Sequence, residues 1–444
     1  MATISRPSVD AASYFGTDPA VSRRDLSDIA AGMTGSDILK IATEIRAMQA
    51  DGKQVLNLTV GDFSPKEFPI PQALTDATCA AMEAGHTNYP PADGLPELRQ
   101  AILHLYEREL GLRYPLSSVL VHSGGRPGIY ATYRALINPG DAVLYPLPSW
   151  NNNHYCHLLG ARPIEVETRR EDGFLPTAEM LAPHIGEARL ISLNTPLNPS
   201  GTVMDRESLR AICELIVKEN ARRAEQGERA GYLLFDQIYW MLTFGQARHV
   251  TPPEVMPEMA AYTIFVDGIS KGFAATGLRV GWTIAPPVLT ATMKDVLSHA
   301  GAWAPRPVQA ASAELLNDVE AIEEYHAQMK TEVQARLTAL YEGFQAMRAD
   351  GLPVDCMEPE GAIYVSANLD LIGREVDGRV LRTNDDIRRY VLESAGFAVV
   401  PFNAFGFTEE NGWFRLSVGA VSRQDIATGM PRLRAAIERV VQGS

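Results

Sequence analysis

The chain has 444 residues, 46% hydrophobic and 21% charged, a balance typical of globular proteins. Because one domain usually spans ~100–200 residues, two or three packed units are expected. The formal net charge is −14 and no lysine- or arginine-rich block occurs, which argues against nucleic acid as a partner.

The cysteines and the N-terminus both bear on location. Four cysteines lie far apart, without the paired spacing of a zinc site or a disulfide framework, and indicate a reducing compartment. The opening MATISRPSVDAASYF has no apolar segment of a secretory signal. The least charged stretch, 135–161, is interrupted by prolines and asparagines, so no membrane span is expected. A cytoplasmic protein is predicted.

The N-terminal part begins with polar, aperiodic residues, and 1–21 are predicted to form a leader. Ser36 can cap a helix that ends near Gly52, because apolar residues recur there at three- and four-residue spacing. The run VLNLTVG then predicts a strand. Residues 22–60 are interpreted as an N-terminal segment that joins a smaller domain.

The middle of the chain, from about Leu95 to about Val308, alternates helical stretches with short apolar runs. These runs are SVLVHSGG, AVLYPLP, LISLNTP, GYLLFDQIY and TIFVDGIS. Strands separated by helices indicate a mainly parallel sheet flanked by helices, the α/β class. We predict a large domain over 61–315, with its ligand site at the carboxyl ends of the strands.

The C-terminal part shows a different order of predicted elements. A long helical stretch covers about Ala310 to Asp350, and AIYVSANL, AVVPFN and WFRLSVG follow as strands mixed with helices. This pattern predicts a smaller α+β domain over 316–444.

The tripeptide Ser270-Lys271-Gly272 directly follows the apolar run TIFVDGI, so Lys271 is expected at a strand end. A desolvated lysine there favours its neutral amine, which can form a Schiff base, although a surface lysine is the alternative. Arg279 lies eight residues on, between glycines that permit close approach to a bound group. Its guanidinium could hold a phosphate or pair with an acidic neighbour.

Two polar residues follow other predicted strands. Asp236 ends GYLLF, where a semi-buried carboxylate needs a cationic partner or serves as a helix cap. Asn198 precedes Pro199 in a dense turn signal and can direct its amide at a ligand, unless the turn is purely structural.

The glycine pair Gly124 and Gly125, followed by Arg126, lies between SVLV and an apparent helix. Backbone N–H groups at such a helix start collect a phosphate. The glycine spacing fits neither a dinucleotide fingerprint nor a Walker loop.

Together these motifs resemble the class I/II, fold-type I aminotransferases, in particular the bacterial aspartate-aminotransferase-like branch. The resemblance runs from about Ser22 to the C-terminus and rests on order as well as content. The glycine loop, PSW, NPSG, DQIY, SKG and GLRVGW occur in the order and at the intervals of that family.

The resemblance implies pyridoxal 5′-phosphate as the cofactor and a set of residues that bind it. Lys271 would form the internal aldimine and then carry the proton between the substrate Cα and the cofactor. Asp236 would pair with the pyridinium nitrogen, and Trp150 would stack on the ring. Asn198 and Tyr239 would hydrogen-bond its phenolic oxygen. The phosphate-binding positions would be Gly124, Gly125, Arg126, Ser270 and Arg279.

The resemblance also implies how the substrate and a second subunit are bound. Arg415 matches the arginine that grips the substrate α-carboxylate, and Gly61 matches a glycine near the substrate. Tyr89 resembles the tyrosine that reaches the cofactor phosphate of the neighbouring subunit, which implies a homodimer with shared active sites. No metal is expected.

Three features depart from the family pattern. Gly268 stands where many relatives have a phosphate-binding serine, so one hydroxyl contact is expected to be missing. In the loop 300–306, no arginine occupies the position that some relatives use for a second substrate carboxylate, although Arg306 is nearby. The leader before Ser22 has no counterpart.

The leading prediction is an aminotransferase acting on an amino acid and a 2-oxo acid. A lyase of the β-elimination type on the same scaffold is the first alternative. A cofactor-binding transcription regulator is the second, but about twenty residues before the fold are too few for a helix-turn-helix module.

Overall fold

The computed structural model describes residues 8–15, 24–35 and 37–443, which belong to two compact units, Met1–Gly35 and Ser36–Ser444. In the first unit, the described residues form a 3-10 turn, η1 (Ala11–Tyr14), and a short helix, α2 (Asp28–Ala31). Ser27 caps α2 by accepting a hydrogen bond from the Ala30 N–H group. The predicted leader lies partly outside the described residues.

A seven-stranded sheet forms the centre of the second unit. Its order is β2-β8-β7-β6-β5-β3-β4, and only β8 runs antiparallel to its neighbours. The predicted α/β class with a mainly parallel sheet is therefore confirmed. The bounds are β2 (Val119–His122), β3 (Ala142–Leu147), β4 (Arg162–Glu167), β5 (Ala188–Asn194), β6 (Tyr232–Asp236), β7 (Thr263–Gly268) and β8 (Gly281–Ile284).

Helices bury both faces of this sheet. Successive residues of β6 point to opposite faces, so Leu233 and Phe235 pack in one apolar cluster and Leu234 in another. Burial on both sides explains why these strands are continuously apolar. One face carries α5 (Pro96–Leu110), α9 (Arg206–Gln226) and α13 (Arg306–Asn317), and the other carries α6 (Gly125–Leu136), α7 (Asn152–Leu159) and α12 (Pro287–Ala300).

The long helical stretch predicted from about 310 to 350 is two helices. α13 ends at Asn317, and α14 (Val319–Ala349) begins after Asp318, whose carboxylate accepts a hydrogen bond from the Ala321 N–H group at 3.0 Å. An aspartate at this position satisfies a free N–H group of a helix start, so it separates the two helices. The apolar periodicity on either side conceals this break.

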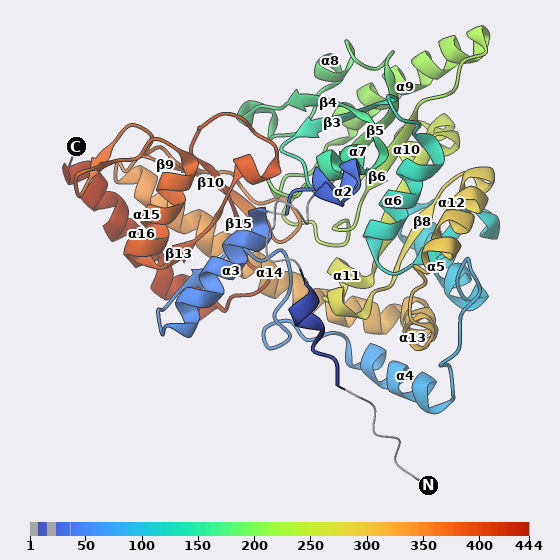
Figure 1. The fold of residues 1–444 in the computed structure, drawn as a ribbon, viewed down its shortest axis with the longest axis horizontal. Coiled ribbons are helices and arrows are strands. Elements are labelled where there is room, and N and C mark those ends of the chain that lie inside the picture. Colours follow the sequence, from blue (N-terminus) through green and yellow to red (C-terminus); the bar gives the residue numbers. More distant parts are fainter. Residues whose placement is uncertain (1–7, 16–23, 36, 444) are drawn as a thin grey trace. The chain divides into compact units, whose positions relative to one another are not determined.

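The C-terminal part contains an antiparallel four-stranded sheet, β14-β15-β10-β9, with α14, α15 (Asn384–Ala395) and α16 (Arg423–Gly443). In Figure 1, α15 and α16 lie at the left and the seven-stranded sheet at the right. These elements form the smaller part that was expected beside the large sheet. The strands are β9 (Val354–Cys356), β10 (Tyr364–Leu369), β14 (Val400–Pro401) and β15 (Trp413–Ser417).

The N-terminal end of the second unit packs against this C-terminal part. β1 (Leu56–Asn57) pairs in parallel with β13 (Phe397–Ala398), and Ile41 and Ile45 of α3 (Asp37–Ala50) join an apolar cluster with Leu392. The boundaries at 21/22, 60/61 and 315/316 remain predictions. The other elements are α4 (Gln72–Glu83), α8 (Ala178–Leu181), α10 (Pro252–Val255), α11 (Ile269–Gly272), β11 (Glu375–Val376) and β12 (Arg379–Val380).

Across the described residues, we find no helix that combines the length and the apolar character needed to cross a membrane.

Candidate active site

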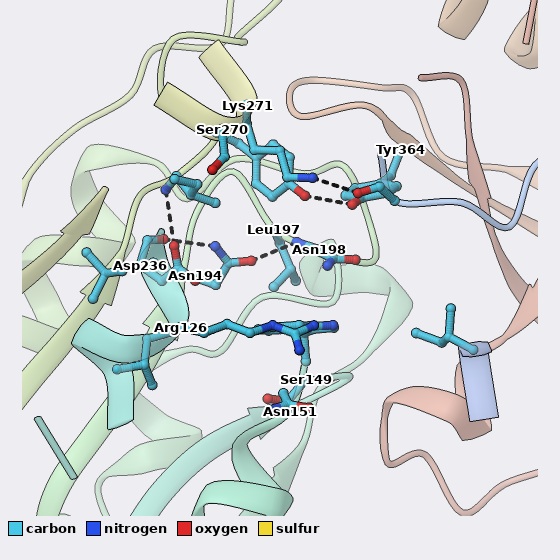
Figure 2. A pocket seen from close by; sticks show the side chains of 18 of the residues that line it. Arg126, Ser149, Asn151, Asn194, Leu197, Asn198, Asp236, Ser270, Lys271 and Tyr364 are labelled. Atoms are coloured by element: carbon cyan, nitrogen blue, oxygen red, sulfur yellow. Dashed lines mark hydrogen bonds between the residues drawn. The ribbon is translucent and has the colours of Figure 1, made fainter. Parts of the chain in front are cut away.

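A cavity of about 690 Å³ lies at the carboxyl ends of β5, β6 and β7 and extends to β10 and β15. Its size is within the usual range for small-molecule sites, ~300–1,000 Å³. Figure 2 shows the side chains that line it, with Lys271 and Ser270 on one side and the extended side chain of Arg126 on the opposite side. It is lined by eleven of the thirteen predicted site residues: Gly61, Gly125, Arg126, Trp150, Asn198, Asp236, Tyr239, Ser270, Lys271, Arg279 and Arg415.

Lys271 enters the cavity from α11, the single turn that follows β7. Its Nζ donates a hydrogen bond to the Gly61 carbonyl oxygen at 2.6 Å. Burial lowers the pKa of Lys271 to about 8, and nearby arginines act in the same direction, whereas Asp62 opposes the shift. A substantial fraction of the amine is therefore neutral near pH 8, as a nucleophilic lysine requires.

Asp236 is the last residue of β6 and points into the cavity (Figure 2). Burial raises the pKa of this carboxyl to about 6, although a hydrogen bond from the Ile238 N–H group at 3.1 Å and the charge of Lys271 oppose the shift. Its carboxylate forms no ion pair with the described side chains, so a cationic ligand atom would complete its environment.

Arg279 and Gly124 lie against each other beside the start of α6 and form the predicted anion-binding corner. The Arg279 guanidinium donates to the carbonyl oxygens of Thr276 at 2.6 Å and Ser123 at 2.9 Å. Gly124 has φ +82° and precedes α6, and a Cβ atom there would lie 2.1 Å from Arg279 Nη2. Only glycine lets the guanidinium lie against this helix start, where free N–H groups favour a phosphate.

Arg415 is a buried cation in β15, with 2% of its surface exposed. It donates to Asn198 Oδ1 at 3.1 Å and to the Thr59 carbonyl oxygen at 2.6 Å, and Nε has no partner among the described residues. The rings of Tyr364 and Phe405 lie 4.7 and 5.0 Å from the guanidinium carbon. Since a buried charge requires compensation, this site suits a carboxylate ligand.

Asn198 and Tyr239, the predicted partners of the cofactor phenolic oxygen, are each held by hydrogen bonds to neighbouring residues. The Asn198 N–H group donates to Asn194 Oδ1 at 2.8 Å, and the Asn194 side chain donates to the Asp236 carbonyl oxygen at 2.8 Å. Tyr239 shares a hydrogen bond of 2.6 Å between its hydroxyl and that of Tyr364. These bonds connect the turn after β5 with the end of β6 and with β10.

Trp150 was expected to stack on the cofactor ring. In the structure the Arg126 guanidinium carbon lies 4.5 Å from the centre of the Trp150 ring, a cation–π arrangement. Both side chains line the cavity. Their roles in binding the cofactor remain predictions.

Tyr89 lies outside the cavity. It is 80% exposed and packs edge-on against Trp303, with ring centres 5.1 Å apart. Arg306 donates a hydrogen bond to the Asn88 side chain and does not line the cavity. The side chain of Arg306 is therefore directed to the loop that carries Tyr89.

The absence of a serine at position 268 has a packing reason. A Cβ atom on Gly268 would lie 2.7 Å from the Val280 carbonyl oxygen and 2.8 Å from the Cα atom of Gly281. Any side chain here would push β8 away from β7, so a serine cannot be accommodated at this position without backbone movement.

Comparisons with known proteins agree with this geometry. The family model described as "Aminotransferase class I and II" matches residues 53–433. The chain belongs to this family. It is 32% identical to an aspartate aminotransferase of Rhizobium meliloti (strain 1021) over 409 residues, 91% of this chain and 94% of the relative.

Solved structures of aminotransferases show the same fold. The crystal structure of the aspartate aminotransferase from Rhizobium meliloti gives a TM-score of 0.84 at 30% identity, covering 94% of this chain and 99% of that one. An aromatic aminotransferase from Pyrococcus horikoshii OT3 gives 0.77 at 25% identity, with coverage of 90% and 98%. These aminotransferases therefore differ in the substrate class that their names carry.

Membership of this aminotransferase family implies pyridoxal 5′-phosphate, and the cavity fits that group. The Gly124 position leaves space that a Cβ atom would fill, beside Arg279 and the start of α6. Asp236 offers a carboxylate that forms no ion pair with the described side chains, and Lys271 offers an amine with a lowered pKa. The cavity thus provides donors for a phosphate, an acceptor for a ring nitrogen and an amine for an aldehyde.

Sequence reasoning missed several residues of the cavity. Asp62 follows Gly61 directly, and Thr276 lies three residues before Arg279, so closeness to a predicted residue was the available signal. Asn194 begins the turn sequence NTPLNPSG that contains Asn198, but only Asn198 was predicted as a site residue. Tyr364 and Thr59 carry no motif, since only the folded chain brings them to Arg415.

Proposed function

We propose that this aminotransferase moves an amino group between an amino acid and a 2-oxo acid in two half-reactions, with Lys271 as the group that binds the cofactor and moves the proton. The single observation that carries this proposal is Lys271 itself, a buried amine with a lowered pKa in a cavity with Asp236, Arg279 and Arg415. Pyridoxal phosphate, when bound, supplies an aldehyde for the amino group and an electron sink for charge at the substrate Cα.

The side chains divide the work between cofactor and substrate. Arg279, Ser270 and the start of α6 would bind the phosphate, and Asp236 would keep the ring nitrogen protonated. Arg415, supported by Asn198, would orient the substrate carboxylate with its planar guanidinium. Lys271, held by Gly61, would then be placed to take and return the proton at the substrate Cα.

The proposed assembly is a homodimer with shared sites, supported by the exposed Tyr89 ring outside its own cavity. The four cysteines are free thiols, which is compatible with a reducing, cytoplasmic location. Aspartate is the first amino donor to test, because the relatives that match most of the chain are named for it.

Replacement of the lysine tests the proposal. Lys271→Ala should fold and bind pyridoxal phosphate weakly, but lose the visible absorbance of the lysine–cofactor adduct and all turnover. Absorbance spectra and a coupled assay with a panel of amino donors measure both effects. Retained turnover would refute the assignment, and release of pyruvate and ammonia by the wild-type chain would favour the lyase alternative.

A further inference from the structure

Two tyrosine hydroxyls meet inside the cavity. Tyr239 lies in the turn after β6, and Tyr364 is the first residue of β10 and points into the cavity (Figure 2). The two hydroxyl oxygens are 2.6 Å apart, and only 4% of Tyr239 and 1% of Tyr364 are exposed. Neither hydroxyl forms a hydrogen bond with any other described residue. Within the described part of the chain, each hydroxyl therefore depends on the other.

This pair of hydroxyls has one hydrogen more than it can use. Each phenol carries a single O–H hydrogen, so one hydroxyl donates across the contact and the other accepts. The hydrogen of the accepting hydroxyl has no acceptor among the described residues, although a buried O–H group is normally hydrogen-bonded. An acceptor atom of a bound ligand would complete the pair. The phenolic oxygen of pyridoxal phosphate is the acceptor that the family resemblance assigns to Tyr239.

The surroundings of Tyr364 favour it as the donor of the shared hydrogen bond. The guanidinium carbon of Arg415 lies 4.7 Å from the centre of the Tyr364 ring. Burial raises the pKa of both hydroxyls, but Arg415 is the largest influence against this rise at Tyr364, whereas the Tyr364 hydroxyl adds to the rise at Tyr239. Because a positive charge beside a phenol favours release of its proton, Tyr364 is the better donor of the two.

The Tyr364 hydroxyl is also confined by Gly61. A Cβ atom at position 61 would lie 2.8 Å from the hydroxyl oxygen, so the absence of a side chain there leaves the space that the hydroxyl occupies. The carbonyl oxygen of the same glycine accepts the hydrogen bond from Lys271. Tyr364 therefore packs against the segment that holds the reactive amine, against Arg415 and against Tyr239.

We propose that Tyr364 is a positioning residue whose hydroxyl donates to the Tyr239 oxygen and so directs the Tyr239 hydrogen to the phenolic oxygen of the cofactor. The inference rests on the proposed binding of pyridoxal phosphate beside Tyr239. A hydroxyl that accepts one hydrogen bond donates the next one more strongly, by ~10–30%. Tyr364 thus strengthens the contact that stabilises negative charge on the phenolic oxygen.

Tyr364→Phe tests the inference, because it removes the hydroxyl and keeps the ring over Arg415. The visible absorbance of the lysine–cofactor adduct, recorded across a pH series, gives the midpoint at which the adduct loses its proton, and it requires no turnover. A weaker donor at the phenolic oxygen stabilises the deprotonated adduct less, so the midpoint should rise by about half a unit. The variant retains all the charged side chains that line the cavity: Asp62, Asp236, Arg126, Lys271, Arg279 and Arg415.

A double-mutant cycle shows whether Tyr364 acts through Tyr239. Tyr239→Phe alone should raise the midpoint by about one to two units, because the direct donor to the phenolic oxygen is lost. In that background, Tyr364→Phe should add no further shift. A second shift of the same size would mean that Tyr364 reaches the cofactor by another route, and it would overturn the inference.

Two further variants separate the hydroxyl from the fold. Tyr390→Phe makes the same chemical change at a buried tyrosine outside the cavity, whose hydroxyl donates to the Ala436 carbonyl oxygen at 2.8 Å. It should lower the thermal midpoint of unfolding and leave the absorbance midpoint where it is. Tyr364→Leu also removes the hydroxyl, and it replaces Tyr364→Phe if that variant does not fold.

The direction of the shift decides the inference. A rise that disappears in the Tyr239→Phe background supports it. An unchanged midpoint overturns it, and so does a fall, because a fall means that Tyr239 donates to Tyr364 and is released toward the cofactor by the substitution. Fluorescence titration of the wild type is measured separately. If pyridoxal phosphate does not bind there, the proposed function itself fails, and the inference fails with it.

Discussion

Arg415 illustrates how a single buried side chain can define a ligand. Its guanidinium is buried, lies over the rings of Tyr364 and Phe405, and is bonded to Asn198 and Thr59 without an acidic partner among the described residues. A buried cation in this state gains more from a carboxylate ligand than an exposed one would, because water no longer screens the charge.

Arg415→Lys should raise KM for the amino donor at least tenfold. The ammonium keeps the charge but loses the planar fork, and one charged hydrogen bond is worth ~1.5–3 kcal/mol. Steady-state kinetics measure the effect, and cofactor affinity should be unchanged. Arg336→Lys is a matched control, since Arg336 is also a buried arginine over a phenylalanine ring but lies outside the cavity. An unaltered KM in Arg415→Lys would contradict the carboxylate role.

At the scale of elements, the site depends on close approach between backbone segments. The loop before α6, the end of β7 and the start of β8 meet with no room for side chains at Gly124, Gly268 and Gly281. Gly281 is limited by the backbone of Gly124 itself, whose carbonyl carbon would lie 2.7 Å from a Cβ atom at position 281. Close backbone contact thus shapes the predicted anion-binding corner, and the guanidinium of Arg279 lies in the space that remains beside Gly124.

Gly124→Ala should weaken pyridoxal phosphate binding by tenfold or more, because the new methyl group overlaps Arg279 and must displace it. Positive φ alone costs an alanine ~1 kcal/mol. Gly140→Ala isolates that cost, since Gly140 has φ +88° with nothing within 4 Å of the new carbon. Fluorescence titration and thermal melting measure both variants. Equal affinities in the two would show that Arg279 does not depend on the glycine.

Much of this arrangement could be predicted from the sequence. Lys271, Asp236 and Asn198 each follow an apolar run, and parallel strands bring such ends to one edge, so their meeting was predictable. β8 was not, because its four residues follow the glycine-rich segment around Arg279 and were interpreted only as the surroundings of that arginine. β4 was not predicted either, because its sequence RPIEVE is half exposed at the edge of the sheet and lacks the continuous apolar run of the inner strands.

At the scale of the whole molecule, the cavity joins residues that are remote in the chain. The hydrogen bond from Arg415 to Thr59 connects positions 356 residues apart. No periodicity or spacing predicts such a contact, which explains why Thr59 and Tyr364 were missed while Arg415, recognised by family resemblance, was not. Residues from both ends of the second unit must therefore be in place before the site is complete.

The proposed shared sites predict complementation between subunits. Lys271→Ala and Tyr89→Ala chains, mixed and reassociated, should form hybrid dimers in which one site has both native residues and the other has neither. Cofactor titration should then show a population with wild-type affinity that neither variant shows alone. Tagged chains isolate the hybrid, and a Lys271→Ala mixture with itself is the control. Absence of the tight population would place Tyr89 outside the site.

The excess of positive charge in the cavity has a practical consequence for handling the protein. Four cations face two carboxylates in a space large enough for several small ions. Oxyanions of a purification buffer, such as phosphate or sulfate, would occupy the corner at Arg279 and compete with the cofactor. The apparent affinity for pyridoxal phosphate measured in phosphate buffer should then be weaker than the affinity measured without oxyanions. Dialysis into an oxyanion-free buffer before the titration should restore the tighter value.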